Sequence, residues 1–179
     1  VGTAVAATEL RVVGPDADSG IGQLLVRGPQ LMSGYWGRPQ ASAEVLVDGW
    51  LHTGDIVRID DGGRVFMLDR RTDLINRGGE NVYSVEVEAA VAAYPAVGES
   101  AVVAVPDDRL GSRVGVCVVP RPGVTFEGHE LVRVARDSLA PFKVPEFVCM
   151  RSEPLPRNPA GKVDKEAVRA QSQWTPLPR

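Results

Sequence analysis

The stretch DRRTDLINRGGENV at residues 69–82 decides how this chain is organised. Before it, short apolar runs alternate with clusters of glycine, proline and aspartate, a pattern typical of β-strands joined by tight turns. After it, apolar residues recur at helical spacing between further apolar runs, which indicates helices mixed with strands. We therefore predict a domain boundary at Asp69–Arg70, with one domain at 1–69 and a second at 70–179.

The first domain is predicted to be a small, antiparallel, β-barrel-like unit. Its predicted elements are strands at 9–13, 23–27, 55–59 and 64–68 and a short helix at 40–46. The sequence Asp60-Asp61-Gly62-Gly63, between the last two strands, is a strong signal for a hairpin.

The second domain is predicted to be α+β. Its predicted elements are strands at 100–105, 115–119 and 143–150 and helices at 84–94, at 127–139 and after Asp164. Val87 and Val91 lie four residues apart, as the buried face of a helix requires. Ser84 and Asp164 are the predicted N-caps, because their side chains can accept hydrogen bonds from the first turn of a helix. The tail at 174–179 is predicted to be poorly ordered.

The composition is that of a globular protein with 44% apolar and 24% charged residues and a formal net charge of −3. No clustered basic face is indicated, so we expect no nucleic-acid partner. No leader and no apolar run of about 18 residues occurs, so we expect no membrane span. Cys117 and Cys149 sit in apolar runs and are predicted to be buried, reduced thiols, which fits a cytoplasmic location. Because the chain starts with Val1, we expect a fragment or a processed product.

Three polar, glycine-containing stretches carry candidate chemistry. In the first, Gly49–Asp55, the carboxylate of Asp55 can accept two hydrogen bonds from a vicinal diol such as a ribose. A turn aspartate that accepts hydrogen bonds from local backbone amides is the alternative. In the second, Asp69–Val82, arginines can meet phosphate or ribose oxygens and paired glycines allow close approach to the backbone; a polar hairpin between domains is the alternative.

The third stretch, Leu155–Val163, presents Lys162 on a loop rich in proline and glycine. An ammonium there can neutralise charge during nucleotidyl transfer, although a surface lysine is the alternative. The stretch lacks the earlier glycine and the following Ser or Thr of a phosphate-cradling Walker loop. His52 and His129 are interpreted as structural, because neither lies in a triad or metal-ligand pattern.

Taken in order, five segments resemble the C-terminal third of the adenylate-forming, AMP-binding superfamily, closest to the acyl-CoA (fatty-acid–CoA) ligases. Gly22–Trp36 is similar to the family's GEL-x-[VI]-x-G … GYW, and Gly49–Asp55 to GW-x-x-TGD. Arg70–Glu88 is similar to R-x-x-D-x-I-x-x-x-G-x-x-[VI]-x-x-x-E-[VI]-E. Leu139–Pro145 is similar to L-x-x-[YF]-K-[VI]-P, and Leu155–Lys165 to LP-R-x-x-x-GK-x-x-[KR].

The resemblance implies a fold and a role for each matching residue. The second domain would be a mobile C-terminal lid, a mixed sheet flanked by helices, and the first would be the β-rich end of a large N-terminal domain. Lys162 would be catalytic. The remaining implied roles are nucleotide binding for Asp55, Arg70 and Asn76, CoA binding for Gly78, Gly79 and Asn81, and the hinge for Thr72.

The implied reaction has two halves, with ATP, Mg2+ and CoA taking part. A carboxylic acid and ATP give acyl-AMP and pyrophosphate; the C-terminal domain then rotates, and the CoA thiol displaces AMP. The family's phosphate loop and its Tyr-Gly-x-Thr-Glu segment belong to an N-terminal portion not contained in this sequence, so the 179-residue chain alone is expected to be inactive.

Two departures from the family pattern and two alternatives remain. Thr72 stands where family hinges commonly have Asp or Lys, and Asp69 stands where Gly is frequent. Gly78–Tyr83 is more similar to the acyl-CoA branch than to the peptide-synthetase branch. The alternatives are an enzyme that passes acyl-AMP to a carrier protein and a non-catalytic lid module that binds a nucleotide or a partner.

Overall fold

The computed structural model describes residues 1–177 of a chain that divides into two compact units, Val1–Thr72 and Asp73–Arg179. We refer to them as unit 1 and unit 2. Which parts of a larger enzyme these units represent stays a prediction.

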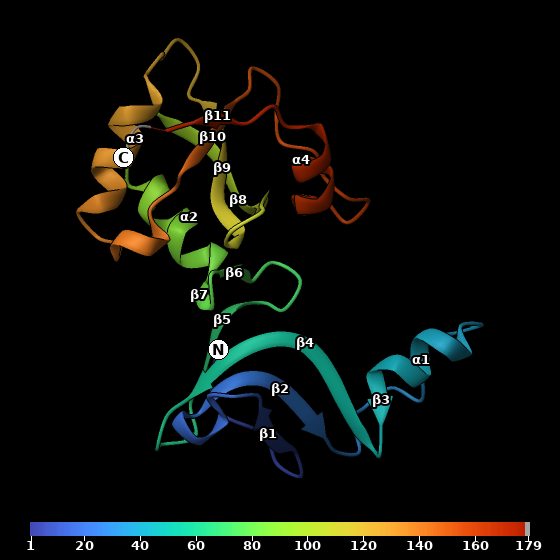
Figure 1. The fold of residues 1–179 in the computed structure, drawn as a ribbon. Helices are drawn as coiled ribbons and strands as arrows, with labels where there is room; N and C mark the ends of the chain where they lie inside the picture. The colour runs from blue at the N-terminus through green and yellow to red at the C-terminus, as the bar shows by residue number, and fades with distance from the viewer. Residues whose placement is uncertain (178–179) are drawn as a thin grey trace. The chain divides into compact units, whose positions relative to one another are not determined.

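Unit 1 is built on a five-stranded antiparallel sheet in which β4 is the central strand. Its strands are β1 (Glu9–Val13), β2 (Ile21–Arg27), β3 (Leu46–Val47), β4 (Trp50–Ile59) and β5 (Val65–Arg70). Strand β2 pairs along one edge of β4, while β3 and then β5 pair along the other. The long β4 is strongly curved, so the sheet curls into a half-barrel (Figure 1). This confirms the predicted barrel-like antiparallel unit.

Three features of unit 1 follow from its local sequence. The Asp60–Gly63 turn closes the β4–β5 hairpin as predicted, with a hydrogen bond of 2.8 Å from the Gly63 amide to the Asp60 carbonyl. Trp50 is buried, and the centroid of its ring lies 4.3 Å from the guanidinium carbon of Arg11 and 4.5 Å from that of Arg27. The short helices are η1 (Ala17–Ser19) and α1 (Pro39–Val45), and α1 agrees with the predicted helix.

Unit 2 is built on a six-stranded mixed sheet with helices on both faces (Figure 1). Its strands are β6 (Ile75–Arg77), β7 (Glu80–Val82), β8 (Val97–Asp107), β9 (Gly111–Pro120), β10 (Phe147–Met150) and β11 (Thr175–Pro176). Its helices are α2 (Ser84–Ala92), α3 (Gly128–Arg136), η2 (Pro141–Lys143) and α4 (Lys165–Gln171). The pairing of β9 with β10 is parallel, whereas β8 and β6 pair with β9 in antiparallel fashion. The predicted α+β class is confirmed.

Strands β8 and β9 supply two cores because their side chains alternate between the faces of the sheet. On one face, Val102 and Val116 are fully buried together with Leu131 of α3. On the other face, Val103 and Cys117 pack with Val168 of α4. Helices α2 and α3 therefore cover one face and α4 covers the other.

Both cysteines are free and buried, as predicted. Cys117 and Cys149 occupy paired positions on β9 and β10. Burial raises the pKa of the Cys117 thiol to about 11, against a smaller opposing effect of the hydrogen bond from Ser172. This thiol is therefore a poor nucleophile at neutral pH.

Three sequence predictions for unit 2 were wrong. Tyr83, not Ser84, occupies the N-cap of α2; Ser84 is fully buried and its hydroxyl accepts a hydrogen bond of 2.6 Å from Lys165 Nζ. Residues 143–146 are not strand, because Pro141 and Pro145 cannot donate to a ladder and a 3-10 turn precedes β10. In the tail, Thr175 and Pro176 pair with β10, while residues 178–179 lie outside the described part.

Asp164 was predicted correctly as the N-cap of α4, with its carboxylate accepting a hydrogen bond of 3.0 Å from the Ala167 amide. Within residues 1–177, no helix combines the length and the apolar character needed to cross a bilayer.

Candidate functional site

Asp55 lies at a β-bulge that interrupts the pairing of β4 with β2. Leu25 pairs with His52 and Gln23 pairs with Ile56, so three residues of β4 oppose the single residue Leu24. Thr53 Oγ1 donates a hydrogen bond of 2.9 Å to the Leu24 carbonyl and accepts one of 3.1 Å from the Asp55 amide. A bulge of this kind re-aims a side chain and holds it there.

The structure brings Asp55 and Arg70 together across the β4–β5 pair. Their Cα atoms are partners in register, and Arg70 Nε lies 2.9 Å from Asp55 Oδ1. That oxygen is buried and has no hydrogen bond of acceptable geometry from any described residue. The carboxylate therefore keeps unused acceptor capacity beside a guanidinium, as a diol-binding group requires.

Asp69 is almost fully buried next to this pair. Its Oδ1 accepts a hydrogen bond of 2.8 Å from the Arg70 amide. The side chain thus fixes the backbone from which Arg70 extends. The sequence placed Asp69 at the domain boundary and at a position where the family often has Gly, but it did not predict that Asp69 holds the Arg70 backbone.

The second stretch forms a β-hairpin of β6 and β7 with Gly78 and Gly79 at its turn. Both glycines have positive φ, 62° and 94°, the geometry that a two-residue hairpin turn demands. Asn76 and Asn81 are cross-strand partners, and Asn76 Oδ1 accepts a hydrogen bond of 3.0 Å from the Gly79 amide. The predicted residues Asn76, Gly78, Gly79 and Asn81 thus share one hairpin.

The two glycines have different surroundings. A Cβ on Gly78 would lie 2.9 Å from Leu110 Cδ2, whereas a Cβ on Gly79 would meet nothing within 4 Å. The Gly78 amide donates a hydrogen bond of 2.8 Å to the Leu110 carbonyl. Gly78 is therefore the packed side of the turn, and Gly79 is the side open to another molecule.

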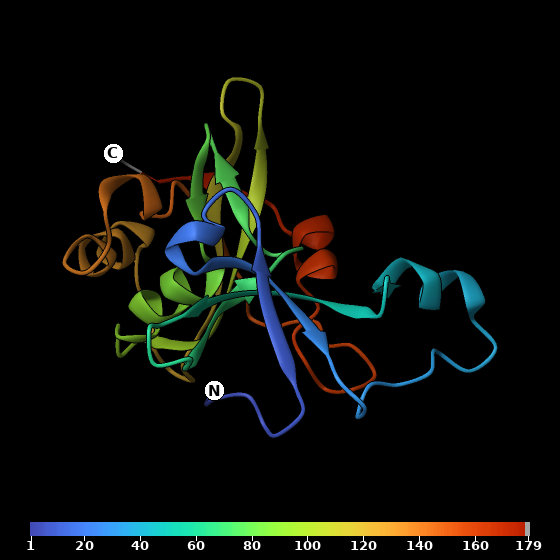
Figure 2. The same ribbon diagram turned by 90° about the horizontal axis from the view of Figure 1, so that it is seen from below.

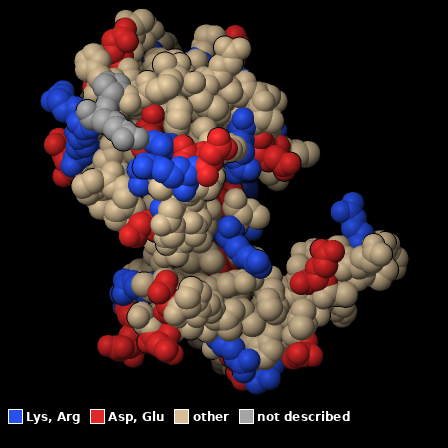
Figure 3. Space-filling view, in the orientation of Figure 1, with Lys and Arg blue, Asp and Glu red and all other residues tan. Residues whose placement is uncertain are grey.

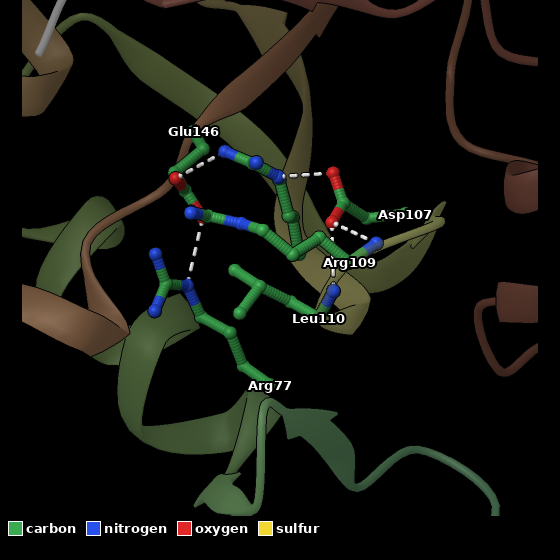
Figure 4. Close-up of polar contacts among 6 residues, drawn as sticks. Arg77, Asp107, Arg109, Leu110 and Glu146 are labelled. Atoms are coloured by element: carbon green, nitrogen blue, oxygen red, sulfur yellow. Dashed lines mark hydrogen bonds and ion pairs between the residues drawn. The ribbon is translucent and has the colours of Figure 1, made fainter.

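Charged side chains connect this turn to β8, β9 and the segment before β10 (Figure 4). Asp107 Oδ1 accepts hydrogen bonds from the amides of Leu110, at 2.9 Å, and Arg109, at 3.1 Å. Arg113 donates through Nε to Asp107 Oδ2 at 2.5 Å and through Nη1 to Glu146 Oε1 at 2.9 Å.

Glu146 Oε2 accepts a hydrogen bond of 2.8 Å from Arg77 Nε. Since Arg77 directly precedes Gly78, these contacts form a closed path that begins and ends at the glycine turn. We call this closed path the hairpin ring. Its members are Arg77, Gly78, Leu110, Asp107, Arg113 and Glu146.

The hydrogen bonds and charges of the hairpin ring lower the pKa values of its two acids. The backbone amide of Leu110, followed by the Arg113 guanidinium, lowers the pKa of Asp107. For Glu146, burial opposes ionisation, but the hydrogen bonds and charges of Arg77 and Arg113 outweigh it, and its pKa is lowered too. Both acids are therefore ionised at neutral pH and the ring is charge-balanced.

A cavity of about 490 Å³ opens beside the hairpin. Its lining residues are Arg77, Arg136, Leu139, Pro141, Val144, Pro145, Glu146 and Leu177. Arg77 is paired with Glu146, so the lining combines the guanidinium of Arg136 with apolar side chains, which suits a ligand that has both a phosphate and an apolar or neutral arm.

Lys162 lies on an exposed loop with a defined backbone. Arg157 and Val163 form a bridge at the base of the loop, and Asn158 Oδ1 accepts hydrogen bonds from the amides of Ala160, at 3.0 Å, and Lys162, at 3.1 Å. Among residues 1–177, the Lys162 ammonium has no ion-pair partner. The loop thus presents an unneutralised positive charge.

The Lys162 loop and the glycine turn lie at opposite ends of β8. Arg157 contacts Glu99 near the start of β8 at 2.7 Å, whereas Gly78 contacts Leu110, just beyond its end. At roughly 3.3 Å per residue, residues 99–107 span about 26 Å. Figure 2 shows the yellow turn after β8 and the orange-red loop before α4 at the two ends of the sheet.

The other candidate residues are not part of these clusters. His52 pairs with Leu25 within the sheet of unit 1, and His129 lies in the first turn of α3. Thr72 is the last residue of unit 1. No group of three or more His, Cys, Asp or Glu side chains within residues 1–177 could hold a metal ion. On the face in Figure 3, acidic and basic side chains are interspersed over unit 2.

Sequence inspection missed Asp107, Arg113 and Glu146, which are up to 69 residues from their ring partners. A weak signal existed for Asp107 alone, because an aspartate followed by Asp108, Arg109, Leu110 and a glycine is typical of a turn between strands.

The comparison with protein families identifies unit 2. Residues 86–162 match the family described as the AMP-binding enzyme C-terminal domain. The chain belongs to this family of AMP-binding, adenylate-forming enzymes. The site residues Asp55, Arg70 and Gly78–Gly79 lie outside the matched range, whereas Lys162 is its last residue.

Known members of the AMP-binding family extend the similarity over most of the chain. Feruloyl-CoA synthase of Amycolatopsis sp is 43% identical over 166 residues, 90% of this chain and 34% of that protein. The solved structure of o-succinylbenzoate CoA synthetase from Bacillus subtilis with its acyl-adenylate intermediate has a TM-score of 0.81 and 32% identity, covering 93% of this chain and 34% of its own. The amide bond synthetase McbA from Marinactinospora thermotolerans has a TM-score of 0.82 and 36% identity, covering 95% of this chain and 36% of its own. This chain therefore spans about a third of the length of these relatives.

Proposed function

We propose that the complete protein carrying this sequence is an ATP-dependent, AMP-forming acid–CoA ligase. A carboxylate first attacks the α-phosphate of ATP, which gives acyl-AMP and pyrophosphate. The thiolate of CoA then attacks the acyl carbonyl, and AMP leaves. The similarity to feruloyl-CoA synthase and to o-succinylbenzoate CoA synthetase supports this class.

The observation that carries the proposal is that the Lys162 loop and the Gly78–Gly79 turn lie at opposite ends of unit 2's strand β8. The loop of the free Lys162 ammonium contacts one end of β8 and the open glycine turn contacts the segment beyond its other end; residues 99–107 between them span about 26 Å at roughly 3.3 Å per residue. One reacting carbonyl does not reach both at once. A two-step reaction in which the domain presents each end in turn accounts for the presence of both.

The nucleotide is bound through Asp55 and Arg70 in this proposal. The Asp55 carboxylate, whose side chain is 25% exposed, accepts from the ribose hydroxyls beside its ion pair with Arg70. Arg70, with a side chain that is 56% exposed, contacts ribose or phosphate oxygens. Asn76 is proposed as a neighbour of the nucleotide when the glycine hairpin is engaged.

Lys162 is the proposed catalytic residue of the first half-reaction. Its ammonium bridges the acid carboxylate and the α-phosphate, where negative charge accumulates as the new bond forms. The hydrogen bonds of Asn158 hold the Lys162 backbone, so only the side chain needs to be ordered on binding.

CoA is the proposed acceptor in the second half-reaction. The pantetheine arm passes Gly79, where no side chain obstructs it, with Gly78 and Asn81 completing the hairpin. The adjoining cavity supplies positive charge for the phosphates of CoA through Arg136, because Arg77 is paired with Glu146.

Several further parts of the proposal concern the whole enzyme. Mg2+ arrives with ATP and is held mainly by phosphate oxygens; no described residue of this chain is assigned as its ligand. Thr72 is the hinge residue, and the isolated chain is inactive because the acid pocket lies in the larger part. The protein acts in the cytoplasm.

A second candidate function differs only in the molecule that accepts the acyl group. The similarity to McbA supports an enzyme that transfers the acyl group to an amine instead of a thiol. A carrier-protein thiol is a further candidate, with the same first half-reaction.

The test uses the natural full-length protein with ATP, Mg2+ and a pool of carboxylic acids. Parallel reactions contain CoA, a pool of amines or neither, and mass spectrometry detects AMP, acyl-AMP and the products. We expect an acyl-CoA only in the CoA reaction, and Lys162→Ala should abolish it. An amide without a thioester would reassign the enzyme to amide synthesis, and acyl-AMP alone would favour a carrier protein. No AMP in any reaction would contradict adenylation.

A further inference from the structure

The hairpin ring contacts the glycine turn through Leu110 and through Arg77, and Asp107 hydrogen-bonds to both branches of the ring. We propose that Asp107 is a positioning residue for the Gly78–Gly79 turn and acts through Leu110 and Arg113. The inference rests on the proposed function, because the position of this turn affects chemistry only when an acceptor passes it.

The first arm of the ring runs through Leu110. Asp107 Oδ1 fixes the Leu110 amide at 2.9 Å, and the Leu110 carbonyl accepts the Gly78 amide at 2.8 Å. The side chain of Leu110 also abuts Gly78, since an added Cβ there would lie 2.9 Å from its Cδ2. A displaced Leu110 would therefore move the packed side of the turn.

The second arm runs through Arg113 and Glu146. Asp107 Oδ2 orients the Arg113 guanidinium, which donates at 2.9 Å to Glu146, and Glu146 accepts from Arg77 at 2.8 Å. Arg77 directly precedes Gly78 in β6. Within the ring, Asp107 is the member that hydrogen-bonds into both arms.

Asp107 also suits a clean experiment because it does not line the cavity beside the hairpin. Its substitution removes no group that would contact an acceptor. Its side chain is 19% exposed and not in the apolar core, so the fold should tolerate the change. The neighbouring Asp108 is exposed and has no hydrogen bond or ion pair among the described residues, which makes it the matched control.

The experiment compares wild type, Asp107→Ala, Asp107→Asn and Asp108→Ala in the full-length protein. The first readout is hydrogen exchange at the Gly78–Gly79 turn, which needs no activity. The second measures acyl-AMP formation and, separately, thioester formation from supplied acyl-AMP and CoA. For Asp107→Ala we expect faster exchange and a loss of thioester formation of about tenfold or more, since small misplacements are costly to rate. Adenylation should stay within about twofold.

Asp107→Asn keeps an oxygen for the Leu110 amide and should recover part of the loss, while Asp108→Ala should match wild type. Unchanged exchange at the turn in Asp107→Ala would overturn the positioning role, as would equal losses in both half-reactions. If wild type forms no thioester, the proposed function fails, and the exchange result alone then decides the positioning role: faster exchange supports it and equal exchange overturns it.

Discussion

At the scale of single residues, the two adjacent glycines of the hairpin turn have different surroundings and therefore different roles. Gly78 donates to Leu110 and is packed against its side chain, whereas Gly79 faces open space. The sequence pair Gly78-Gly79 indicated a close approach to the backbone but not which glycine provides it. That distinction depends on Leu110, more than 30 positions along the chain.

Gly79→Leu should lower thioester formation by about 100-fold while acyl-AMP formation changes little, because the added side chain occupies the open side of the turn. The positive φ of 94° adds strain of about 1–3 kcal/mol. Gly123→Leu is the control, since Gly123 has a φ of 77° and open space in an unrelated loop. Equal thioester rates in the two variants, measured with supplied acyl-AMP, would contradict the role of Gly79.

Lys162→Ala should reduce acyl-AMP formation by about 100- to 1,000-fold, the usual effect of removing one stabiliser of transition-state charge. Thioester formation from supplied acyl-AMP should remain within about threefold. Both rates are measured in single-turnover reactions, with Lys162→Arg retaining the charge as a comparison. An equal loss in both halves would show that Lys162 does not belong to one half-reaction.

At the scale of elements, the sequence predicted the strands and helices with a strong hydrophobic period and missed those made by polar residues. Strands β6 and β7 are three residues long and contain Asn76, Arg77, Glu80 and Asn81, so no alternation marks them. Ser84 was wrongly assigned as a cap because a buried serine bonded to Lys165 has the same local sequence as an exposed capping serine. The cap at Asp164, by contrast, was predictable, because its hydrogen-bond partner Ala167 is only three residues away.

Asp164→Ala should destabilise α4 by about 1 kcal/mol, because the Ala167 amide loses its acceptor. Hydrogen exchange at Ala167 measures this locally in the full-length protein. Glu166→Ala is the control, as Glu166 lies exposed in the same first turn without capping it. If both variants exchange alike at Ala167, the cap contributes nothing measurable.

The β8–β9 turn should lose stability in acid. The pKa values of Asp107 and Glu146 are lowered in the folded protein, so their contribution is complete above the ordinary values of 3.8 and 4.5. It declines as pH falls through the folded pKa values, because protonation then favours the unfolded form. Exchange at the Leu110 amide, corrected for its intrinsic pH dependence, should show protection that decreases below about pH 4. Protection that is independent of pH in Asp107→Asn but not in wild type would assign the effect to Asp107.

At the scale of the whole molecule, the class of fold and the three candidate stretches were predictable, but the contacts between distant segments were not. The Asp55–Arg70 pair follows from one hairpin, so the sequence of unit 1 contains its cause. The link from Arg77 to Glu146 depends on the parallel placement of β10 beside β9, which no local pattern encodes. Motif order identified the family, and three-dimensional structure supplied the supporting residues.

Thr72→Pro tests the proposed hinge. Proline fixes φ, so we expect one half-reaction to persist within a few-fold and the other to fall by about 100-fold, since the domain would be held in one arrangement. Each half-reaction is assayed separately in the full-length protein. Thr125→Pro, in an exposed loop of unit 2, should leave both unchanged. Normal rates for both halves in Thr72→Pro would place the hinge elsewhere.

The hairpin ring also has a consequence for the order of events during folding. The partners Asp107 and Arg113 are 6 residues apart, Arg113 and Glu146 are 33 apart, and Arg77 and Glu146 are 69 apart. Contacts between nearby residues close small loops and form early, whereas distant pairs wait for the chain to be assembled. Glu146 should thus join last, after the β8–β9 ribbon exists. Because the contacts of Glu146 form late, its substitution should accelerate unfolding while hardly slowing refolding.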